Sequence, residues 1–272
     1  MELSDYELRD LLDFAIEVAK TGGQVVMRHY RHSQPWRKAD GSLVSRADIE
    51  AEEAMVARLQ RADARAQILG EELGGADEGI PGQQWIIDPI DGTSWFALGL
   101  PIFGVLIALV VDRDPVLGVI HCPALAETVS AARGLGCWHQ MGVEPPVRGR
   151  VARCDSIQEA RLSAASLPMT DAAGSHATMR ARITPIIRDC ALFVTAGDCV
   201  QHALVATGRL HAAIDPLMRP WDSAAVIPCI LEAGGFVGAI HETSKALAFA
   251  GSLISASSER LLNQVTAATR TT

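Results

Sequence analysis

The stretch Trp85-Ile86-Ile87-Asp88-Pro89-Ile90-Asp91-Gly92-Thr93-Ser94 decides how the rest of this 272-residue chain is interpreted. Its apolar first part predicts a buried strand, and Gly-Thr-Ser after the second acid predicts the start of a helix. Two carboxylates three residues apart therefore fall at a strand end, which is a rigid mount for metal ligands. Taken alone, the same two acids also fit a turn residue and a helix N-cap.

The donor atoms of this stretch suit a magnesium ion. Mg²⁺ takes about six oxygen ligands at roughly 2.0–2.1 Å, partly from carboxylates and partly from water and substrate phosphate. Asp88 and Asp91 supply carboxylate oxygens. Pro89 fixes its φ and turns the chain, so the Ile90 carbonyl can become a further ligand. Because the next N–H groups lie at a helix start, where an anion is favoured, metal and phosphate are expected at one loop.

Two distant segments place further acids in similar positions. Gln67-Ile68-Leu69-Gly70-Glu71-Glu72 is a short apolar run that ends in acids, as a neighbouring strand at the same sheet edge would. Pro220-Trp221-Asp222-Ser223-Ala224-Ala225 opens an apolar helical segment with Asp222 at its N-terminus. Alone, Asp222 fits an ordinary N-cap, and the two glutamates fit a solvated acidic loop.

Together the three segments resemble the signature of the inositol monophosphatase family of metal-dependent phosphatases. That signature is Gly-Glu-Glu at a strand end, then Asp-Pro-Ile-Asp-Gly-Thr, then a distant Trp-Asp before Ala-Gly-Gly, here residues 233–235. The segment from Lys38 to Asp48 is similar to the family's N-terminal Lys, Val-Thr and Asp segment. The resemblance spans about residue 10 to residue 265. It implies an α+β fold, a layered α-β-α-β-α sandwich with an antiparallel sheet in the N-terminal half and a smaller mixed sheet in the C-terminal half.

The resemblance also implies a role for individual residues. Two or three Mg²⁺ ions per site, with Mn²⁺ as an alternative, would be bound by Glu71, Asp88, the Ile90 carbonyl, Asp91 and Asp222. The catalytic residues would be Glu71, Asp48 and Thr93, the last two orienting and deprotonating the attacking water. The residues expected to bind substrate are Asp91, Gly92, Thr93, Ser94, Asp198, Asp215 and Asp222, with the phosphate on the N–H groups of Gly92 and Thr93. Other interpretations are an ST-type cap for Thr93 and a helix-dipole partner for Asp48.

The expected reaction is phosphomonoester hydrolysis by direct in-line attack of water, without a phosphoenzyme. Ions about 3.5–4 Å apart clamp the attacking and leaving oxygens, and several acids are needed to offset their repulsion. A threonine hydroxyl can accept the proton of the water while donating its own to a carboxylate. No Cys or Ser lies in a nucleophile motif that would compete for this role.

Substrate choice is expected to depend on the second half of the chain. The family's acid that contacts the alcohol part of the substrate corresponds to Asp215, which also fits a turn before Pro216. Ala196-Gly197-Asp198-Cys199 resembles the Gly-Asp-Cys of histidinol-phosphate phosphatases, where a carboxylate can pair with a substrate amine; Asp198 also fits a helix cap. Three features depart from that branch: Ser94 replaces its frequent Lys or Arg, Trp95-Phe96-Ala97-Leu98 is unusual beside either branch, and Thr195-Ala196 stands where Tyr-Gly is frequent.

These features rank the candidate functions. L-Histidinol phosphate is the expected substrate, ahead of myo-inositol monophosphate, and a 3'(2'),5'-bisphosphate nucleotidase is a third candidate. A regulatory binding module that no longer hydrolyses is the alternative from another class. Loss of a metal ligand or of Thr93 would indicate such a module, and neither is lost.

Composition and pattern set the remaining expectations. A net charge of −8 argues against a nucleic-acid surface, six cysteines without metal-ligand spacing indicate free thiols, and no apolar run approaches about 18 residues. We therefore expect a cytoplasmic protein, bound to no membrane, and the family resemblance implies a homodimer whose partner is a small phosphorylated metabolite. The expected elements are helices at 6–32, 46–61, 178–189, 198–208 and 221–233, strands at 101–111 and 116–121, a seam at 134–153, and subdomains 1–140 and 141–272.

Overall fold

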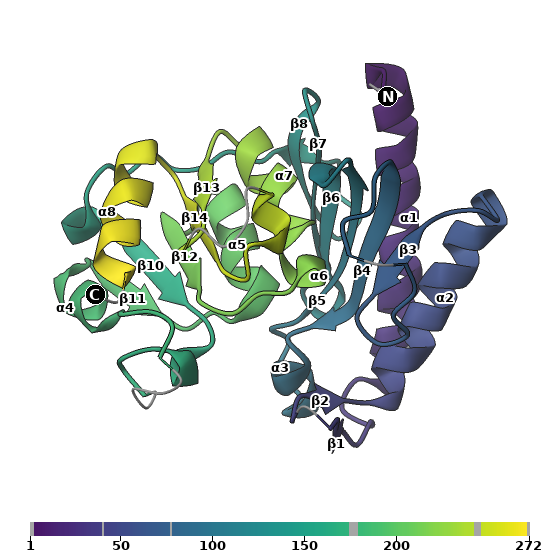
Figure 1. The fold of residues 1–272 in the computed structure, drawn as a ribbon, viewed down its shortest axis with the longest axis horizontal. Helices are drawn as coiled ribbons and strands as arrows, with labels where there is room; N and C mark the ends of the chain where they lie inside the picture. Colours follow the sequence, from purple (N-terminus) through teal and green to yellow (C-terminus); the bar gives the residue numbers. More distant parts are fainter. Residues whose placement is uncertain (1–2, 40, 77, 174–178, 242–245, 271–272) are drawn as a thin grey trace.

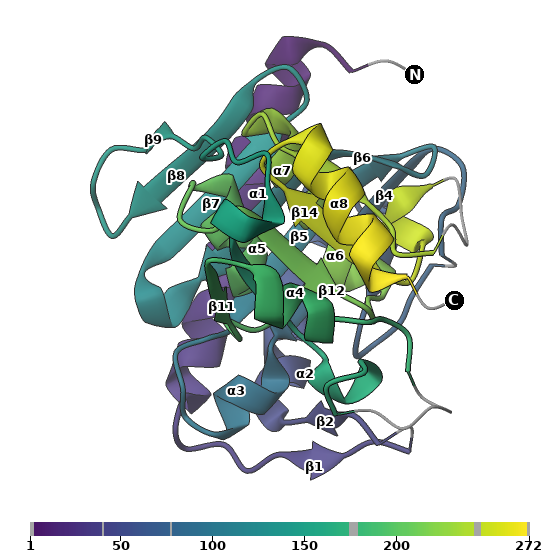
Figure 2. The ribbon, with the colours of Figure 1, turned by 90° about the vertical axis from the view of Figure 1, so that its left-hand side faces the viewer.

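The fold consists of five alternating layers of helix and sheet (Figure 1). The computed structural model describes residues 3–39, 41–76, 78–173, 179–241 and 246–270. Helices α1 (Asp5–His29) and α2 (Arg46–Ala62) cover the outer face of a seven-stranded sheet, and α5 (Asp198–Ala206), α6 (Pro220–Ser223) and α7 (Val226–Glu232) lie between the sheets. Helices α4 (Thr184–Asp189) and α8 (Glu259–Thr269) lie in front of the five-stranded sheet in Figure 2. The predicted α-β-α-β-α sandwich is confirmed.

The first sheet follows the order of the chain and is antiparallel except at one edge. Its strands are β3 (Ile68–Gly70), β4 (Gln83–Asp91), β5 (Gly104–Val111), β6 (Asp114–Cys122), β7 (Glu127–Ala132), β8 (Gly136–Met141) and β9 (Val147–Arg148). Only β3 and β4 among them run parallel. The predicted hairpin at residues 101–121 is present, although its first strand begins at Gly104. Its turn is Asp112-Arg113, both with positive φ.

The second sheet is smaller and mixed, as predicted. Its order is β11-β10-β12-β14-β13, with β10 parallel to both neighbours and β14 antiparallel to both of its own. The strands are β10 (Arg161–Ala164), β11 (Leu192–Val194), β12 (Ala212–Asp215), β13 (Phe236–Gly238) and β14 (Leu253–Ala256). The remaining elements are β1 (Trp36–Arg37), β2 (Leu43–Val44), α3 (Thr93–Ala97) and the 3₁₀ turns Pro123–Leu125, Ile157–Glu159, Leu167–Met169 and Leu247–Phe249.

Two expectations about the connecting regions need correction. The segment 134–153 is not simply a seam, because β8 and β9 extend the first sheet to residue 148. The helix expected at 178–189 begins at Thr184, since Pro185 favours the first turn of a helix. Thr178 and Asp40 lie outside the described residues. The division after residue 140 stays a prediction.

Helix α1 shows how the sequence produces the outer layer. Ser4 and Glu7 form a capping box at its start, and its apolar stripe packs on the sheet. A Cβ atom on Gly22 would lie 2.7 Å from Met55 Sδ of α2, and one on Gly23 would lie 2.7 Å from His121 Cδ2 of β6. The Gly-Gly pair therefore permits close packing of α1 against both α2 and the sheet.

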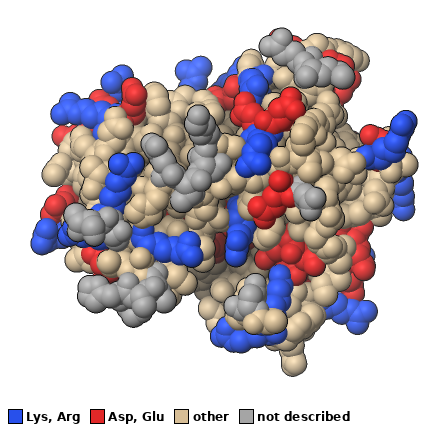
Figure 3. Space-filling view, viewed as in Figure 1, with Lys and Arg blue, Asp and Glu red and all other residues tan. Residues whose placement is uncertain are grey.

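The middle layer joins the two halves of the molecule. Leu106, Ile120 and Val129 of the first sheet form one apolar core with Ile227 and Ile230 of α7. No described helix is long and apolar enough to span a bilayer. Acidic and basic side chains lie next to one another over both halves on the face drawn in Figure 3.

Candidate metal and phosphate site

The parallel edge of the first sheet places two of the expected ligands side by side. Gly70 of β3 is in register with Ile87 of β4, so Glu71 and Asp88 follow at neighbouring positions of the same edge. The strand continues through both acids of the signature instead of ending before them, and its register with β5 shifts between Asp88 and Asp91. This irregularity is a bulge, which re-aims the side chains around it.

Asp222 reaches this edge from the other half of the molecule. It lies in the first turn of α6, and its Oδ2 accepts a hydrogen bond from the Arg219 N–H at 2.7 Å. Carboxylate oxygens of Asp88, Asp91 and Asp222 all lie within 4.8 Å of one another. Asp222 is not the N-cap of α6, because Arg219 holds that position; Asp222 lies three residues later and accepts the Arg219 N–H, and its second oxygen remains available to the acidic cluster.

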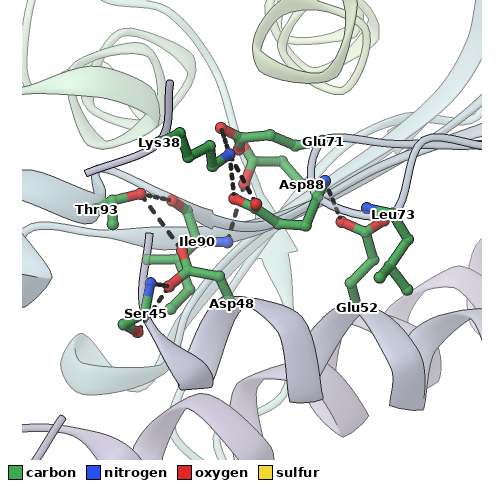
Figure 4. A network of polar contacts seen from close by, with 10 residues as sticks. Lys38, Ser45, Asp48, Glu52, Glu71, Leu73, Asp88, Ile90 and Thr93 are labelled. Atoms are coloured by element: carbon green, nitrogen blue, oxygen red, sulfur yellow. Dashed lines mark hydrogen bonds and ion pairs between the residues drawn. The ribbon is translucent and has the colours of Figure 1, made fainter. Parts of the chain in front are cut away.

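Glu71 lies at the margin of this cluster, beside a lysine. Lys38 Nζ is 3.5 Å from Glu71 Oε1 and 2.7 Å from Glu72 Oε2, as the close view in Figure 4 shows for Lys38 and Glu71. Burial, followed by the charge of Asp222, raises the pKa of Glu71 to about 8. Glu71 therefore belongs to the same electrostatic unit although it stands outside the cluster of three.

The clustered acids repel one another, and a divalent cation fits them. Burial raises the pKa of Asp222 to about 7, although the hydrogen bond from the Arg219 N–H opposes the rise. Burial also raises the pKa values of Asp88 and Asp91 well above the usual range, with the charges of Glu71 on Asp88 and of Asp198 on Asp91 next in size. Every donor in this set is a hard oxygen, which is the ligand type that Mg²⁺, Ca²⁺ and Mn²⁺ prefer. Cations would relieve the repulsion, so the residues present fit a divalent metal site.

Thr93 connects the segment of the two signature acids, residues 88–91, to α2. Its hydroxyl lies 3.0 Å from the Ile90 carbonyl oxygen and 3.4 Å from Asp48 Oδ1 (Figure 4). The other oxygen of Asp48 accepts from both the N–H and the hydroxyl of Ser45 at 2.7 Å. Asp48 is fully buried, and burial raises its pKa. Asp48 stabilises the first turn of α2 and also faces Thr93. Its interpretation as a partner of the helix dipole is therefore compatible with its expected role beside the attacking water.

The loop expected to receive the phosphate turns at a glycine. Gly92 has φ +92° and precedes α3, which begins at Thr93. A side chain at Gly92 would be strained there and would lie 3.1 Å from Asp198 Oδ2. Ser94 is exposed at the start of the same short helix. The phosphate contacts of this loop stay a prediction.

Asp198 and Asp215 lie on the second half, facing the acidic cluster. Asp198 is the first residue of α5, and the next N–H, that of Cys199, donates to Asp91 Oδ2. Asp215 is 4% exposed and accepts from Ser166 Oγ and the Leu217 N–H, both at 3.2 Å. Burial, then the charge of Asp198, raises the pKa of Asp215 well above the usual range. The hydrogen bond from the Leu217 N–H shows that Asp215 stabilises the turn after β12. Contact between Asp215 and the substrate stays a prediction.

Glu52 is a residue of the site that the sequence motifs did not indicate. It is fully buried on α2, and its two carboxylate oxygens accept from the N–H groups of Glu72 and Leu73, each at 2.8 Å. A side chain on Gly70 would overlap this carboxylate. Glu52 thus holds the loop that carries Glu71. The available signal was its position one helical turn after Asp48, on the same face of α2.

Comparison with known proteins identifies the family. The model of the inositol monophosphatase family matches residues 7–272, nearly the whole chain. The chain belongs to the inositol monophosphatase family. It is 36% identical to the histidinol-phosphatase of Chlorobaculum parvum over 82% of this chain and 83% of that protein. It is 35% identical to the histidinol-phosphatase of Mycobacterium tuberculosis, covering 73% of this chain and 74% of that one.

Solved structures agree with this membership. The IMPase of Thermotoga maritima has a TM-score of 0.82 to this chain at 29% identity, covering 95% of this chain and 96% of that one. This member of the inositol monophosphatase family is therefore a phosphatase, and the predicted metal-dependent class is supported by both the family and the acidic cluster.

Proposed function

We propose that this inositol monophosphatase family member hydrolyses L-histidinol phosphate with Mg²⁺ as its metal. Two relatives above one-third identity carry the name histidinol-phosphatase. The observation that carries the proposal is the carboxylate of Asp198, which lies over Gly92 at the margin of the phosphate loop. The cationic amine of histidinol phosphate would meet a carboxylate there.

The charges of the site favour a cationic alcohol. Glu71, Asp88, Asp91 and Asp222 would be neutralised by divalent cations, whereas Asp198 and Asp215 are left for the substrate. A buried carboxylate forms a strong, short hydrogen bond with an ammonium group. Inositol offers hydroxyl groups only, so it would leave the negative charge of both aspartates uncompensated.

The side chains of this protein have separate tasks in the reaction. When bound, divalent cations supply Lewis-acid polarisation of the phosphate and a more acidic water. Thr93 Oγ1 accepts a proton from the attacking water and passes its own proton to Asp48 Oδ1. Burial raises the pKa of Asp48, which makes its carboxylate a better acceptor for that proton. Gly92 lets the backbone approach the phosphate, and Asp198 with Asp215 orients the leaving alcohol.

Phosphate release from a small panel of esters tests this function. The panel is L-histidinol phosphate, myo-inositol 1-phosphate and adenosine 3',5'-bisphosphate, each assayed with Mg²⁺, with Mn²⁺ and with a chelator. We expect the highest kcat/KM for histidinol phosphate with Mg²⁺, and no turnover with chelator. A preference for either other ester would overturn the substrate, and inactivity on a broad ester panel would favour the binding module.

We further propose that the protein is a cytoplasmic homodimer. Leu98 and Leu100, after α3, are 72% and 40% exposed, and these apolar side chains offer a contact surface between copies. Light scattering should give the mass of two chains. The mass of a single chain at micromolar concentration would refute the dimer.

A further inference from the structure

Trp95 of α3 makes a contact across the two halves that no family motif requires. Burial raises the pKa of Asp198, and hydrogen bonding by the Trp95 side chain opposes that rise. A Cβ atom on Gly197 would overlap Trp95 Nε1 and lie 2.8 Å from its Cε2. Only a glycine at position 197, where φ is +70°, leaves room for this ring. Trp95 and the Gly-Asp pair are therefore matched to each other in shape.

Asp198 is held in one place by this contact and by its backbone. Its φ is +41°, a left-handed conformation that is strained for a non-glycine residue. The adjacent Cys199 N–H is fixed on Asp91, and Asp198 Oδ2 points over Gly92. A strained residue persists only where its surroundings determine its position, and such residues concentrate at functional sites.

We infer that Trp95 is a positioning residue that fixes the Asp198 carboxylate toward the alcohol part of the substrate and so sets selectivity for a cationic alcohol. This inference rests on the proposed function. A carboxylate that is already oriented loses no rotational freedom when the ammonium group arrives, so more of the interaction is realised as affinity. Trp95 acts through Asp198 and touches no reacting atom.

A mutant cycle with two substrates separates positioning from packing. Trp95→Phe keeps the ring and removes the N–H, and Asp198→Asn removes the charge. The readout is the ratio of kcat/KM for histidinol phosphate to kcat/KM for myo-inositol 1-phosphate. We expect Trp95→Phe to lower this ratio about tenfold, mainly through KM, since a hydrogen bond to a charged group is worth at least about that much. The double variant should equal Asp198→Asn alone, because Trp95 has no effect once the charge is gone.

A second readout requires no turnover. Calorimetry of L-histidinol, the alcohol product, should show about tenfold weaker binding to Trp95→Phe than to the unmodified protein. Trp138→Phe is the matched control, because Trp138 lies on β8 under Arg148, away from the acidic cluster. It should change neither the ratio nor the affinity.

Each failure has a distinct signature. An unmodified enzyme that prefers inositol phosphate overturns the proposed function. The role of Trp95 is overturned if Trp95→Phe lowers kcat/KM equally for both esters. It is also overturned if the effect of Trp95→Phe on the ratio adds to that of Asp198→Asn. If Trp95→Phe does not fold by circular dichroism, Gly197→Ala decides, since its methyl group would displace the indole and should lower the ratio equally.

Discussion

Individual carboxylates in this molecule combine a structural contact with a chemical task. Asp48 caps α2 through Ser45 and faces the Thr93 hydroxyl, and Asp222 accepts the Arg219 N–H while it joins the acidic cluster. Because an amide oxygen can accept the structural hydrogen bond but carries no charge, Asp-to-Asn changes separate the two uses.

Asp91→Asn should abolish turnover and leave the fold intact. The amide oxygen can still accept the Cys199 N–H, whereas a neutral group is a poor ligand for a cation. We expect kcat/KM to fall by more than about 100-fold, with an unchanged circular dichroism spectrum. Asp112→Asn is the matched control, since Asp112 Oδ1 also accepts a backbone N–H, that of Gly82, in an exposed turn. An active Asp91→Asn enzyme would contradict the assignment of the site.

Glu52→Gln should weaken metal binding, although Glu52 is not itself one of the expected metal ligands. A glutamine can accept one of the two N–H groups of residues 72 and 73 but turns its own N–H₂ toward the other. The loss of one buried hydrogen bond costs about 1–3 kcal/mol and displaces Glu71. The Mg²⁺ concentration for half-maximal rate should rise about tenfold. Glu53→Gln, on the exposed side of α2, should leave that concentration unchanged.

The residues of the site differed in how visible they were in the sequence. Asp88 and Asp91 stand in one short motif, so their proximity follows from local structure, and the parallel edge adds Glu71. Glu52 and Trp95 act through segments far away in the sequence, and neither contact leaves a local pattern. Spacing along a chain reports local neighbours only.

Among the elements, β6 packs closely against the start of α7. A Cβ atom on Gly118 would lie 2.8 Å from Ala225 Cα and closer still to its carbonyl oxygen. The atoms that this Cβ atom would meet belong to the backbone, which cannot change rotamer as a side chain can. Any side chain at position 118 must therefore displace the start of α7 from the sheet.

Gly118→Ala should therefore destabilise the whole fold. Overpacking of this kind costs about 1–3 kcal/mol, and we expect the upper end because backbone must move. Urea unfolding measures the loss as a lower midpoint. Gly238→Ala on β13 is the control, since its Cβ atom would meet only the flexible end of Leu262 at 3.3 Å. Equal midpoints for the two variants would show that α7 can shift freely.

Long, regular elements were predictable, and short ones were not. The apolar stripe of α1 and the paired apolar runs of β5 and β6 are strong periodic signals. The segment of β8 and β9 contains glycine and proline, which also mark loops, so its strands were missed. There the pairing with β7 determines the structure more than the local sequence does.

Across the whole molecule, the acidic site ties stability to pH and to metal. The pKa values of Glu71 and Asp222 are about 8 and about 7 in the folded protein and near 4 when unfolded. Between these values the folded state binds more protons, so its stability falls as pH rises. Buried His121 and His202, with pKa values of about 4 and about 3, have the opposite effect below about pH 6.5.

Without metal, Glu71 and Asp222 alone should therefore account for a loss of about 2 kcal/mol of stability between pH 6.5 and pH 8. Chemical unfolding in the presence of a chelator measures this loss. With saturating Mg²⁺ the decline should disappear, because the cations replace the protons on the carboxylates. Asp222→Asn should reduce the decline in the metal-free protein. A metal-free protein that becomes more stable over this range would contradict the electrostatics of the site.

The layered architecture also sets the order in which the molecule can be completed during synthesis. The first sheet is complete at Arg148, but the helices that cover its inner face begin at Asp198 and end at Glu232. A chain leaves the ribosome N-terminus first. While residues 149–232 are being added, the apolar side chains of Leu106, Ile120 and Val129 remain exposed to solvent. A chaperone would be needed most during this interval. With the metal site proposed here, the nascent chain gains hydrolytic activity only after Asp222 has emerged.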